Sequence, residues 1–330
     1  MVTISDVAKE AGVSLSTASR ALNNSVLVSQ EKREQVLEAV RRLGYRPIRT
    51  SAARQAQQNK IIVVVTAMLN RDMLDCIRQT ADELGYQIAM SYVGESYDEG
   101  YRNALALVRM LPSHLICGLI FIHNECRDPD MWKEFSTYPL VQIGEYKGVS
   151  PLRSIMIDDR AAAYDMTMYL LKQGYRRIVY VRTDRDERYS YGKPRLEGYC
   201  SALREAGVEV DTALILEGEY LLDGGVDVAR QVLKMKKRPD AVFCTSDHLA
   251  AGCLAELEKQ GVRVPEDIAV CGFDNHEVSE YCQPGLTTVA QPYGEMGVEA
   301  VRMLDMVMSG AIFSGRKIFA EHTLMIREST

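Results

Sequence analysis

Short apolar runs alternate with helical stretches along most of this chain. The run Ile61 to Val65 is continuous and β-branched, which is typical of a parallel strand buried on both faces. Further strands are expected at 87–92, 118–122 and 140–143, and, in a second series that begins at Ile155, at 178–181, 241–245 and 268–273. Helices are expected between them at 73–84, 101–111, 161–173, 196–206, 225–235 and 249–260. Two successive series of βαβ units predict an α/β fold with two doubly wound lobes.

Charge is distributed unevenly along the chain. The net charge of -6 over 330 residues argues against a nucleic-acid-binding protein. However, the first 60 residues carry ten basic and five acidic side chains, a net charge of +5, so the remaining 270 carry 29 basic and 40 acidic side chains, a net charge of -11. A basic head on an acidic body is expected when one segment of a chain meets a polyanion.

Several classes of protein are excluded by what the sequence lacks. No apolar run approaches the roughly 20 residues that span a bilayer, and the first residues do not resemble a secretory signal. The eight cysteines have no CxxC spacing, which favours reduced thiols in a cytoplasmic protein. No catalytic motif and no metal-binding spacing of histidines is present, so we expect no enzyme activity, cofactor or metal. A solute-binding protein or a nucleoside-type hydrolase is the alternative.

The basic head is predicted to form three short helices. A capping-box-like start at Thr3 and Asp6 opens the first helix, which Gly12 ends. Ser14 can cap a second helix from Leu15 to about Asn23, and Ser29 can cap a third that ends at Gly44. Two helices joined by so tight a turn predict a helix-turn-helix.

The second helix of a helix-turn-helix enters the major groove of DNA. Here it presents Leu15, Ser16, Thr17, Ser19 and Arg20. Arg20 can make a bidentate pair with guanine or can hold a phosphate, and Leu15 can meet a thymine methyl group. The alternative is that these residues form an ordinary solvated helix face.

The head also resembles a known family. The run ISDVAKEAGVSLSTASRALN over residues 4–23, followed by Val28-Ser29 and by LGYRP over 43–47, resembles the N-terminal signature of the LacI/GalR family of bacterial repressors. Ala18 stands where that family more often has valine. The resemblance implies DNA contacts from the head, and the candidates are Thr3, Ser14, Leu15, Ser16, Thr17, Ser19, Arg20, Asn23, Ser29 and Tyr45.

The resemblance also implies the organisation of the whole chain. A helix-turn-helix head is expected at 1–46, a hinge with a short helix at 47–60, and an effector-binding and dimerisation domain at 61–330. That domain is expected to have two Rossmann-like lobes of periplasmic-binding-protein type, the first at about 61–157 and 291–319 and the second at about 158–290 and 320–330. These features imply a cytoplasmic repressor that binds double-stranded operator DNA as a homodimer, and that associates with the nucleoid when bound.

The hinge departs from the family pattern. Relatives insert a leucine into the minor groove at this point, but residues 47–60 contain no leucine. One alignment places Ala56 at the position of the leucine, and an alignment without gaps places Arg54 there. We hypothesise that Arg54 reads the shape of the minor groove in place of the leucine.

An effector site is implied between the lobes. Arg195 and Asp274 match the arginine and the acid through which the family contacts its effector. Such residues suit a sugar, because a carboxylate accepts hydrogen bonds from paired hydroxyl groups and a guanidinium donates two parallel hydrogen bonds. Ser246 and Tyr220 lie near further family contacts, and Met68, Leu69 and Asn70 occupy the corresponding loop of the first lobe. Each of these residues has an alternative role in maintaining the fold, such as capping a turn or a helix.

The chemistry of the effector is left open. Residues 182–195 contain four arginines and a lysine, which fits an anionic effector such as a sugar acid or a sugar phosphate. A solvated loop whose arginines pair with Asp184, Asp186 and Glu187 is the favoured alternative. Regulation by a sugar that closes the cleft, and regulation by a partner protein that binds the first lobe, are both left open by the sequence.

Overall fold

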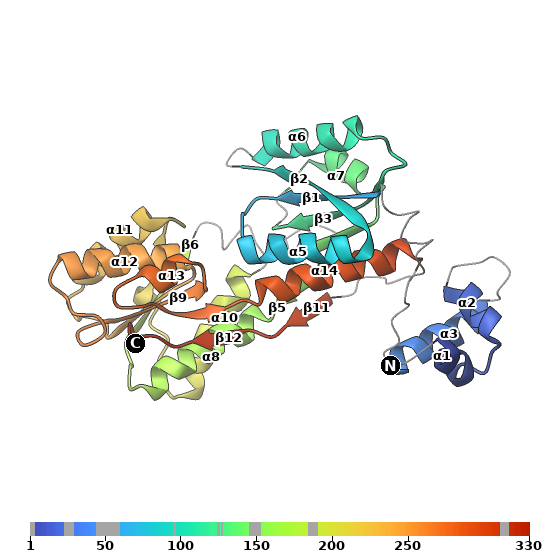
Figure 1. Ribbon diagram of the computed structural model, residues 1–330. Coiled ribbons are helices and arrows are strands. Elements are labelled where there is room, and N and C mark those ends of the chain that lie inside the picture. The colour runs from blue at the N-terminus through green and yellow to red at the C-terminus, as the bar shows by residue number, and fades with distance from the viewer. Residues whose placement is uncertain are drawn as a thin grey trace. The chain divides into compact units, whose positions relative to one another are not determined.

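A computed structural model describes residues 4–22, 30–43, 60–94, 97–123, 126, 128–144, 153–183, 191–310 and 317–330 (Figure 1). Contacts divide the chain into two units: Met1–Ile143, Pro151–Arg153 and Gly297–Arg316 form the first, and Gly144–Ser150, Ser154–Met296 and Lys317–Thr330 form the second. Residues 154–157, 291–296 and 317–319, which were expected in the first lobe, group with the second unit by contacts, but the strands at 153–157 and 317–320 belong to the sheet of the first unit. Within the described ranges, no helix is both long enough and apolar enough to cross a membrane.

The N-terminal head consists of three helices, α1 (Ile4–Glu10), α2 (Leu15–Leu22) and α3 (Gln30–Leu43). All three contribute to one small core, whose buried members are Val7, Ala8, Ala18, Ala21, Val36 and Ala39. The turn between α1 and α2 uses Gly12 at φ +64, a conformation that side chains disfavour. Two of the expected helix boundaries are confirmed, since α1 is followed by Gly12 and α2 begins directly after Ser14.

Strands β1 to β4 of the first unit belong to a six-stranded sheet with the strand order β11-β5-β4-β3-β1-β2, in which β5 spans Arg153–Ile157 and β11 spans Lys317–Ala320. The elements of this unit are β1 (Lys60–Thr66), α5 (Arg71–Leu84), β2 (Tyr86–Tyr92), α6 (Tyr97–Met110), β3 (Ile116–Ile122), α7 (Pro129–Phe135) and β4 (Leu140–Ile143). Figure 1 shows α6 and α7 on one side of the strands and α5 on the other. Side chains at alternate positions of β1 and β3, such as Val63 and Phe121, pack in one cluster with Tyr101 of α6 and Phe135 of α7.

The second unit contains a sheet with the strand order β12-β10-β9-β8-β6-β7, in which only the β10–β12 pair is antiparallel. Its elements are α8 (Asp159–Lys172), β6 (Ile178–Thr183), α10 (Gly192–Glu205), the 3-10 helix η1 (Thr212–Leu214), β7 (Ile215–Gly218), α11 (Leu222–Leu233), β8 (Ala241–Cys244), α12 (Asp247–Lys259), β9 (Ala269–Asp274), α13 (Val278–Tyr281), β10 (Thr287–Ala290) and β12 (Thr323–Met325). The remaining strands, β5 and β11, belong to the other sheet. Strand β11 pairs in parallel with β5. Helix α14 (Tyr293–Met308) begins in this unit, and its residues from Gly297 group with the first.

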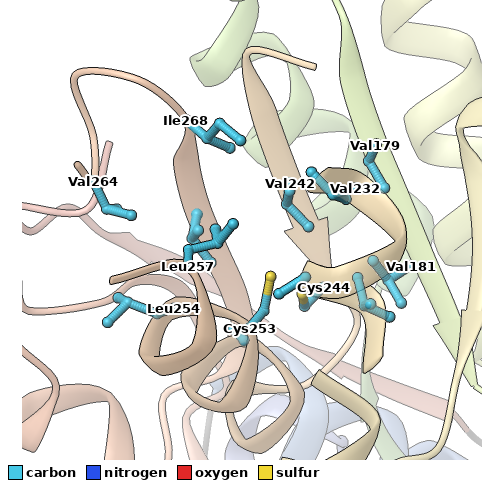
Figure 2. Packing of buried hydrophobic residues seen from close by; sticks show 14 of the residues in the cluster. Val179, Val181, Val232, Val242, Cys244, Cys253, Leu254, Leu257, Val264 and Ile268 are labelled. Carbon is cyan, nitrogen blue, oxygen red and sulfur yellow. The ribbon is translucent and has the colours of Figure 1, made fainter. Parts of the chain in front are cut away.

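The second sheet is packed on both faces. Valines of β6 and β8 form a cluster with Val228 and Val232 of α11 and with Leu254 and Leu257 of α12. Figure 2 shows members of this cluster, among them Val181, Val242 and Leu257, gathered between the strands and α12, with Cys244 and Cys253 buried among them. On the opposite face, Tyr180 of β6 packs against Tyr199 of α10, with 5.0 Å between ring centroids. The two packed faces hold the ends of the parallel strands in fixed positions.

Candidate functional site

Helix α2 carries the expected DNA-reading residues Leu15, Ser16, Thr17, Ser19 and Arg20. The Leu15 side chain is 52% exposed although it is apolar, so its methyl groups remain free to contact a base. The Thr17 N–H donates to Ser14 Oγ at 3.1 Å, which makes Ser14 the N-cap of α2. The hydroxyl groups of Ser14 and Thr17 lie 2.8 Å apart, so both residues stabilise the start of this helix. Thr3, Asn23, Ser29, Tyr45, Arg54 and Ala56 lie outside the described residues.

Polar residues gather at the carboxyl edge of the second sheet. Strands β8, β9 and β10 are parallel neighbours, so their carboxyl ends lie at the same edge. Thr245 and Ser246 follow β8, Asp274 ends β9, and Gln291 follows β10. Two of the expected effector contacts, Arg195 and Asp274, meet at this edge.

Arg195 is the most constrained side chain of this edge. It is 4% exposed, and its Nε donates to Asp159 Oδ1 at 2.7 Å. Its Nη1 donates to the Thr245 carbonyl at 3.0 Å, and its Nη2 lies 3.8 Å from Asp274 Oδ1. The guanidinium also lies 3.5 Å from the centroid of the Phe273 ring, a cation–π geometry. The buried charge is therefore compensated within the protein.

The electrostatics of this group reflect a tightly coupled pair. Burial opposes the charge on Arg195, but the carboxylates of Asp159 and Asp274 together raise its pKa. Burial raises the pKa of Asp159, while the Arg195 guanidinium acts in the opposite direction. Each partner depends on the other to remain charged inside the protein.

Asp274 is 6% exposed and lies at a backbone bend. Its φ is +105, and that of the next residue, Asn275, is +52. Its Oδ1 accepts a hydrogen bond from Gln291 Nε2 at 2.7 Å, and its Oδ2 lies 3.6 Å from His276 Nε2. A non-glycine residue at such a φ is uncommon and often marks a functional position.

A row of rings beside Asp274 was not identified from the sequence. The His276 ring is stacked on the Tyr293 ring, with 5.9 Å between centroids and 14° between planes, and the His248 ring lies 5.3 Å from that of His276. Burial, and then the neighbouring His276, lower the pKa of His248. The signal available in the sequence was position alone, because His248 and His276 follow the expected ends of two neighbouring strands.

The Ser246 hydroxyl is used by the fold, and one of its partners is the backbone of Tyr220. The Leu249 N–H donates to Ser246 Oγ at 3.2 Å, so Ser246 caps α12, and its hydroxyl donates to the Tyr220 carbonyl at 3.3 Å. Asp247, the first residue of α12, does not cap this helix. Its carboxylate accepts instead from the His276 N–H at 2.6 Å and from the Thr288 hydroxyl at 2.5 Å. Burial, followed by the charge of Asp274, raises the pKa of Asp247 well above its ordinary value.

The expected contacts of the first unit lie in the loop between β1 and α5. Asn70 caps α5, because its Oδ1 accepts from the Met73 N–H at 2.9 Å. The backbone of Met68 is bonded to the Thr66 hydroxyl, and Leu69 is exposed. Asn70 and Met68 therefore have structural roles whether or not they also contact a ligand.

The cations of the segment 182–195 that the structure describes all have anionic partners. Arg182 pairs with Glu217, Lys193 Nζ lies 3.6 Å from Glu197, and Arg195 is buried against Asp159. These partners are not the Asp184, Asp186 and Glu187 of the solvated-loop interpretation, which lie outside the described residues together with Arg185 and Arg188, so that interpretation stays a prediction. Among the residues that are described, no group of three or more His, Cys, Asp or Glu side chains could hold a metal ion.

A helix-turn-helix head followed by two doubly wound units defines a DNA-binding regulator. The family described as "Bacterial regulatory proteins, lacI family" matches residues 3–47, and a "Periplasmic binding protein-like domain" matches residues 167–330. The transcriptional repressor CytR of Escherichia coli K12 is 33% identical over 99% of this chain and 96% of its own length.

Solved structures agree with this relationship. A complex of the transcriptional regulator CelR with cellobiose has a TM-score of 0.73 and 29% identity, and all of both chains is covered. A lac repressor dimer bound to operator and the anti-inducer ONPF has a TM-score of 0.69 and 25% identity over 99% of this chain and 98% of its own. The chain belongs to the LacI family, and it is a DNA-binding transcriptional regulator and not an enzyme.

Proposed function

We propose that this regulator is a repressor whose affinity for operator DNA is controlled by a small effector, a sugar or a sugar derivative. The effector binds at the carboxyl edge of the second sheet, beside Asp274 and the row His248, His276 and Tyr293. The observation that carries this proposal is the Asp274 carboxylate, which is fixed by Gln291 next to stacked rings. Carboxylates beside flat rings suit ligands that combine hydroxyl groups with apolar faces.

An uncharged effector fits this edge better than an anion. Asp159, Asp247 and Asp274 lie there together with Arg195, whose guanidinium already faces Asp159 and the Thr245 carbonyl. A ligand phosphate or carboxylate would have to compete with Asp159 for Arg195 and would meet the negative charge of Asp274. Cellobiose, which forms a complex with the structural neighbour CelR, is also uncharged. We also propose that the effector lies between the two lobes and contacts Met68, Leu69 and Asn70 of the first lobe.

On DNA, the chain acts as a homodimer that reads a pseudo-palindromic operator. One helix-turn-helix covers only a half-site, so two copies of α2 enter successive major grooves. Arg20 contacts a base edge or a phosphate at each half-site. Arg54 and Ala56 lie in the hinge, where Arg54 reads the minor groove.

Ligand screening by thermal unfolding tests the effector. Purified protein is heated in the presence of neutral mono- and disaccharides, uronates and sugar phosphates, and each compound that raises the Tm is then added to an operator-binding assay. We expect neutral sugars to raise the Tm of the wild type and to change its operator affinity, and Asp274→Asn to abolish both effects. Stabilisation by uronates or sugar phosphates alone would overturn the assignment of an uncharged effector, and a response that survives Asp274→Asn would overturn the site.

A further inference from the structure

The end of the chain is bonded to the bend that carries Asp274. Arg327 follows β12 closely, and its side chain is 15% exposed. Its Nη2 donates to Asn275 Oδ1 at 2.8 Å, and its Nη1 donates to the Leu286 carbonyl at 2.7 Å. The backbone N–H of Arg327 donates to Thr287 Oγ1 at 2.9 Å. One side chain thus joins the C-terminal segment to the residue that follows Asp274.

The bend itself is held by groups from other segments. Asp274 and Asn275 both have φ in the left-handed region, which costs free energy unless surrounding contacts stabilise it. The Asn275 N–H donates to Thr288 Oγ1 at 3.3 Å, and the His276 N–H donates to Asp247 Oδ2 at 2.6 Å. Among these contacts, only those of Arg327 and of the Ser279 hydroxyl, which donates at 3.3 Å, hold the Asn275 side chain.

We propose that Arg327 is a positioning residue for the effector site. Through the Asn275 side chain it holds the left-handed bend that places the Asp274 carboxylate beside Arg195 and Gln291. Arg327 does not contact the effector. Its consequence for effector affinity rests on the function proposed above, whereas its effect on the bend does not.

The C-terminal segment is anchored well enough to serve as such a support. Ser329 is fully buried, its Oγ donates to the Val270 carbonyl at 2.6 Å, and the same Oγ accepts from the Thr287 N–H at 2.9 Å. These bonds attach the segment to β9 and β10 independently of the Arg327 side chain. Replacing that side chain therefore removes its bonds to Asn275, Ser279 and the Leu286 carbonyl and leaves the segment in place.

Hydrogen–deuterium exchange of the full-length protein tests the link without any ligand. The His276 amide reports on the bend, because it is hydrogen-bonded to Asp247 only when the bend is formed. In Arg327→Met, which keeps an apolar stem but no donor, we expect exchange in peptides covering 273–281 to accelerate by about tenfold. Peptides covering β6 should keep their wild-type rates. Arg263→Met, which removes an exposed arginine paired with Asp267 in the same unit, is the matched control.

A second variant separates the route through Asn275 from a general loss of packing. Asn275→Gly accepts the left-handed conformation but has no amide for Arg327 to hold. Arg327 also donates to Ser279 Oγ at 3.3 Å and lies 3.6 Å from Glu280, so adding Arg327→Met to Asn275→Gly should accelerate exchange in 273–281 less than Arg327→Met does in the wild type. Unchanged exchange in Arg327→Met, equal acceleration in β6, or a full additional effect in the double variant would each overturn the proposal.

Effector affinity provides the functional readout. For any neutral sugar that stabilises the wild type, the Kd measured by calorimetry should rise about tenfold in Arg327→Met, while operator affinity without sugar stays at the wild-type value. An unchanged Kd would overturn the role of Arg327 in the effector site. If no sugar binds the wild type, the proposed effector class fails, and the exchange experiment still decides whether Arg327 holds the bend.

Discussion

Arg195 and Asp159 form a buried ion pair, with 2.7 Å between Nε and Oδ1, at the edge of the sheet where Asp274 ends β9. Asp274 lies further from the same guanidinium, at 3.8 Å. Arg195 therefore has a partner within the protein and is not an unpaired cation that waits for an anionic ligand. Its first role is to fix the geometry of the edge.

Removing Asp159 should be costly. In Asp159→Ala the Arg195 guanidinium stays buried and loses its nearest carboxylate, so we expect the free energy of unfolding to fall by about 3–5 kcal/mol. Replacing both partners together, as in Asp159→Leu with Arg195→Met, removes both charges of the pair but leaves Asp274 buried without the guanidinium, so it should restore only part of the stability. Urea unfolding measures each variant. A loss below about 1 kcal/mol in Asp159→Ala would show that the pair contributes little.

Helix α10, which carries Arg195, is held against α8 by a close contact at Gly198. A Cβ on Gly198 would lie 2.2 Å from the Arg160 carbonyl oxygen and 2.9 Å from the Tyr164 nitrogen. Gly198→Ala must therefore separate the helices, and it should lower the free energy of unfolding by about 1–3 kcal/mol. Glu197→Ala, at the exposed neighbouring position, should change it by less than about 0.5 kcal/mol. Equal effects of the two substitutions would contradict the close packing.

Hydrophobic periodicity predicted most of the longer strands and helices. Each strand and helix expected from the sequence within the described residues is present, and its bounds lie within four residues of the expected ones. The elements that were not anticipated are mostly short: α7, β7, α13, β10, β11 and β12 span three to seven residues each. Segments of that length hold too few residues to display a period, and tertiary contacts form them. Helix α14, with 16 residues, is the exception, because it is long enough to display a helical period and was still not predicted.

The site was only partly predictable for a different reason. Arg195 and Asp274 were expected from motifs that surround them in the sequence, and the structure brings them together. Asp159, His248 and Arg327 were not expected, because their roles depend on neighbours 28 to 52 positions away. Ser246 was expected as a ligand contact, yet its hydroxyl caps α12, a local use that competes with ligand binding for the same group.

Acid should weaken the fold through His248. Burial and His276 lower its folded pKa below the unfolded value, so the unfolded state binds the proton more readily. The free energy of unfolding should therefore decrease as the pH falls below about 6.5 and stay constant above it. We expect His248→Gln to reduce this loss between about pH 7.5 and pH 5.5 in urea titrations. A pH profile in His248→Gln that is identical to that of the wild type would assign the acid sensitivity to other groups.

DNA recognition should depend on Arg20. Arg20→Ala should weaken binding to a selected operator duplex by about 1–3 kcal/mol and change the preferred base at one position of each half-site. Arg78→Ala, which removes one exposed arginine from α5, serves as the charge-matched control and should not affect binding. Fluorescence anisotropy with a library of half-site variants measures both. A uniform loss across all sequences, with a shallower salt dependence, would make Arg20 a phosphate contact.

The change in operator affinity when a neutral sugar is added tests the central claim most directly. Anisotropy titrations compare the wild type with Asp274→Asn on one operator duplex, with and without a sugar that stabilises the wild type. The account predicts that the sugar shifts the wild-type Kd for DNA by about fivefold or more, that Asp274→Asn binds the operator normally without sugar, and that this variant does not respond to it. An operator affinity that responds to sugar equally in both proteins, or in neither, would contradict it.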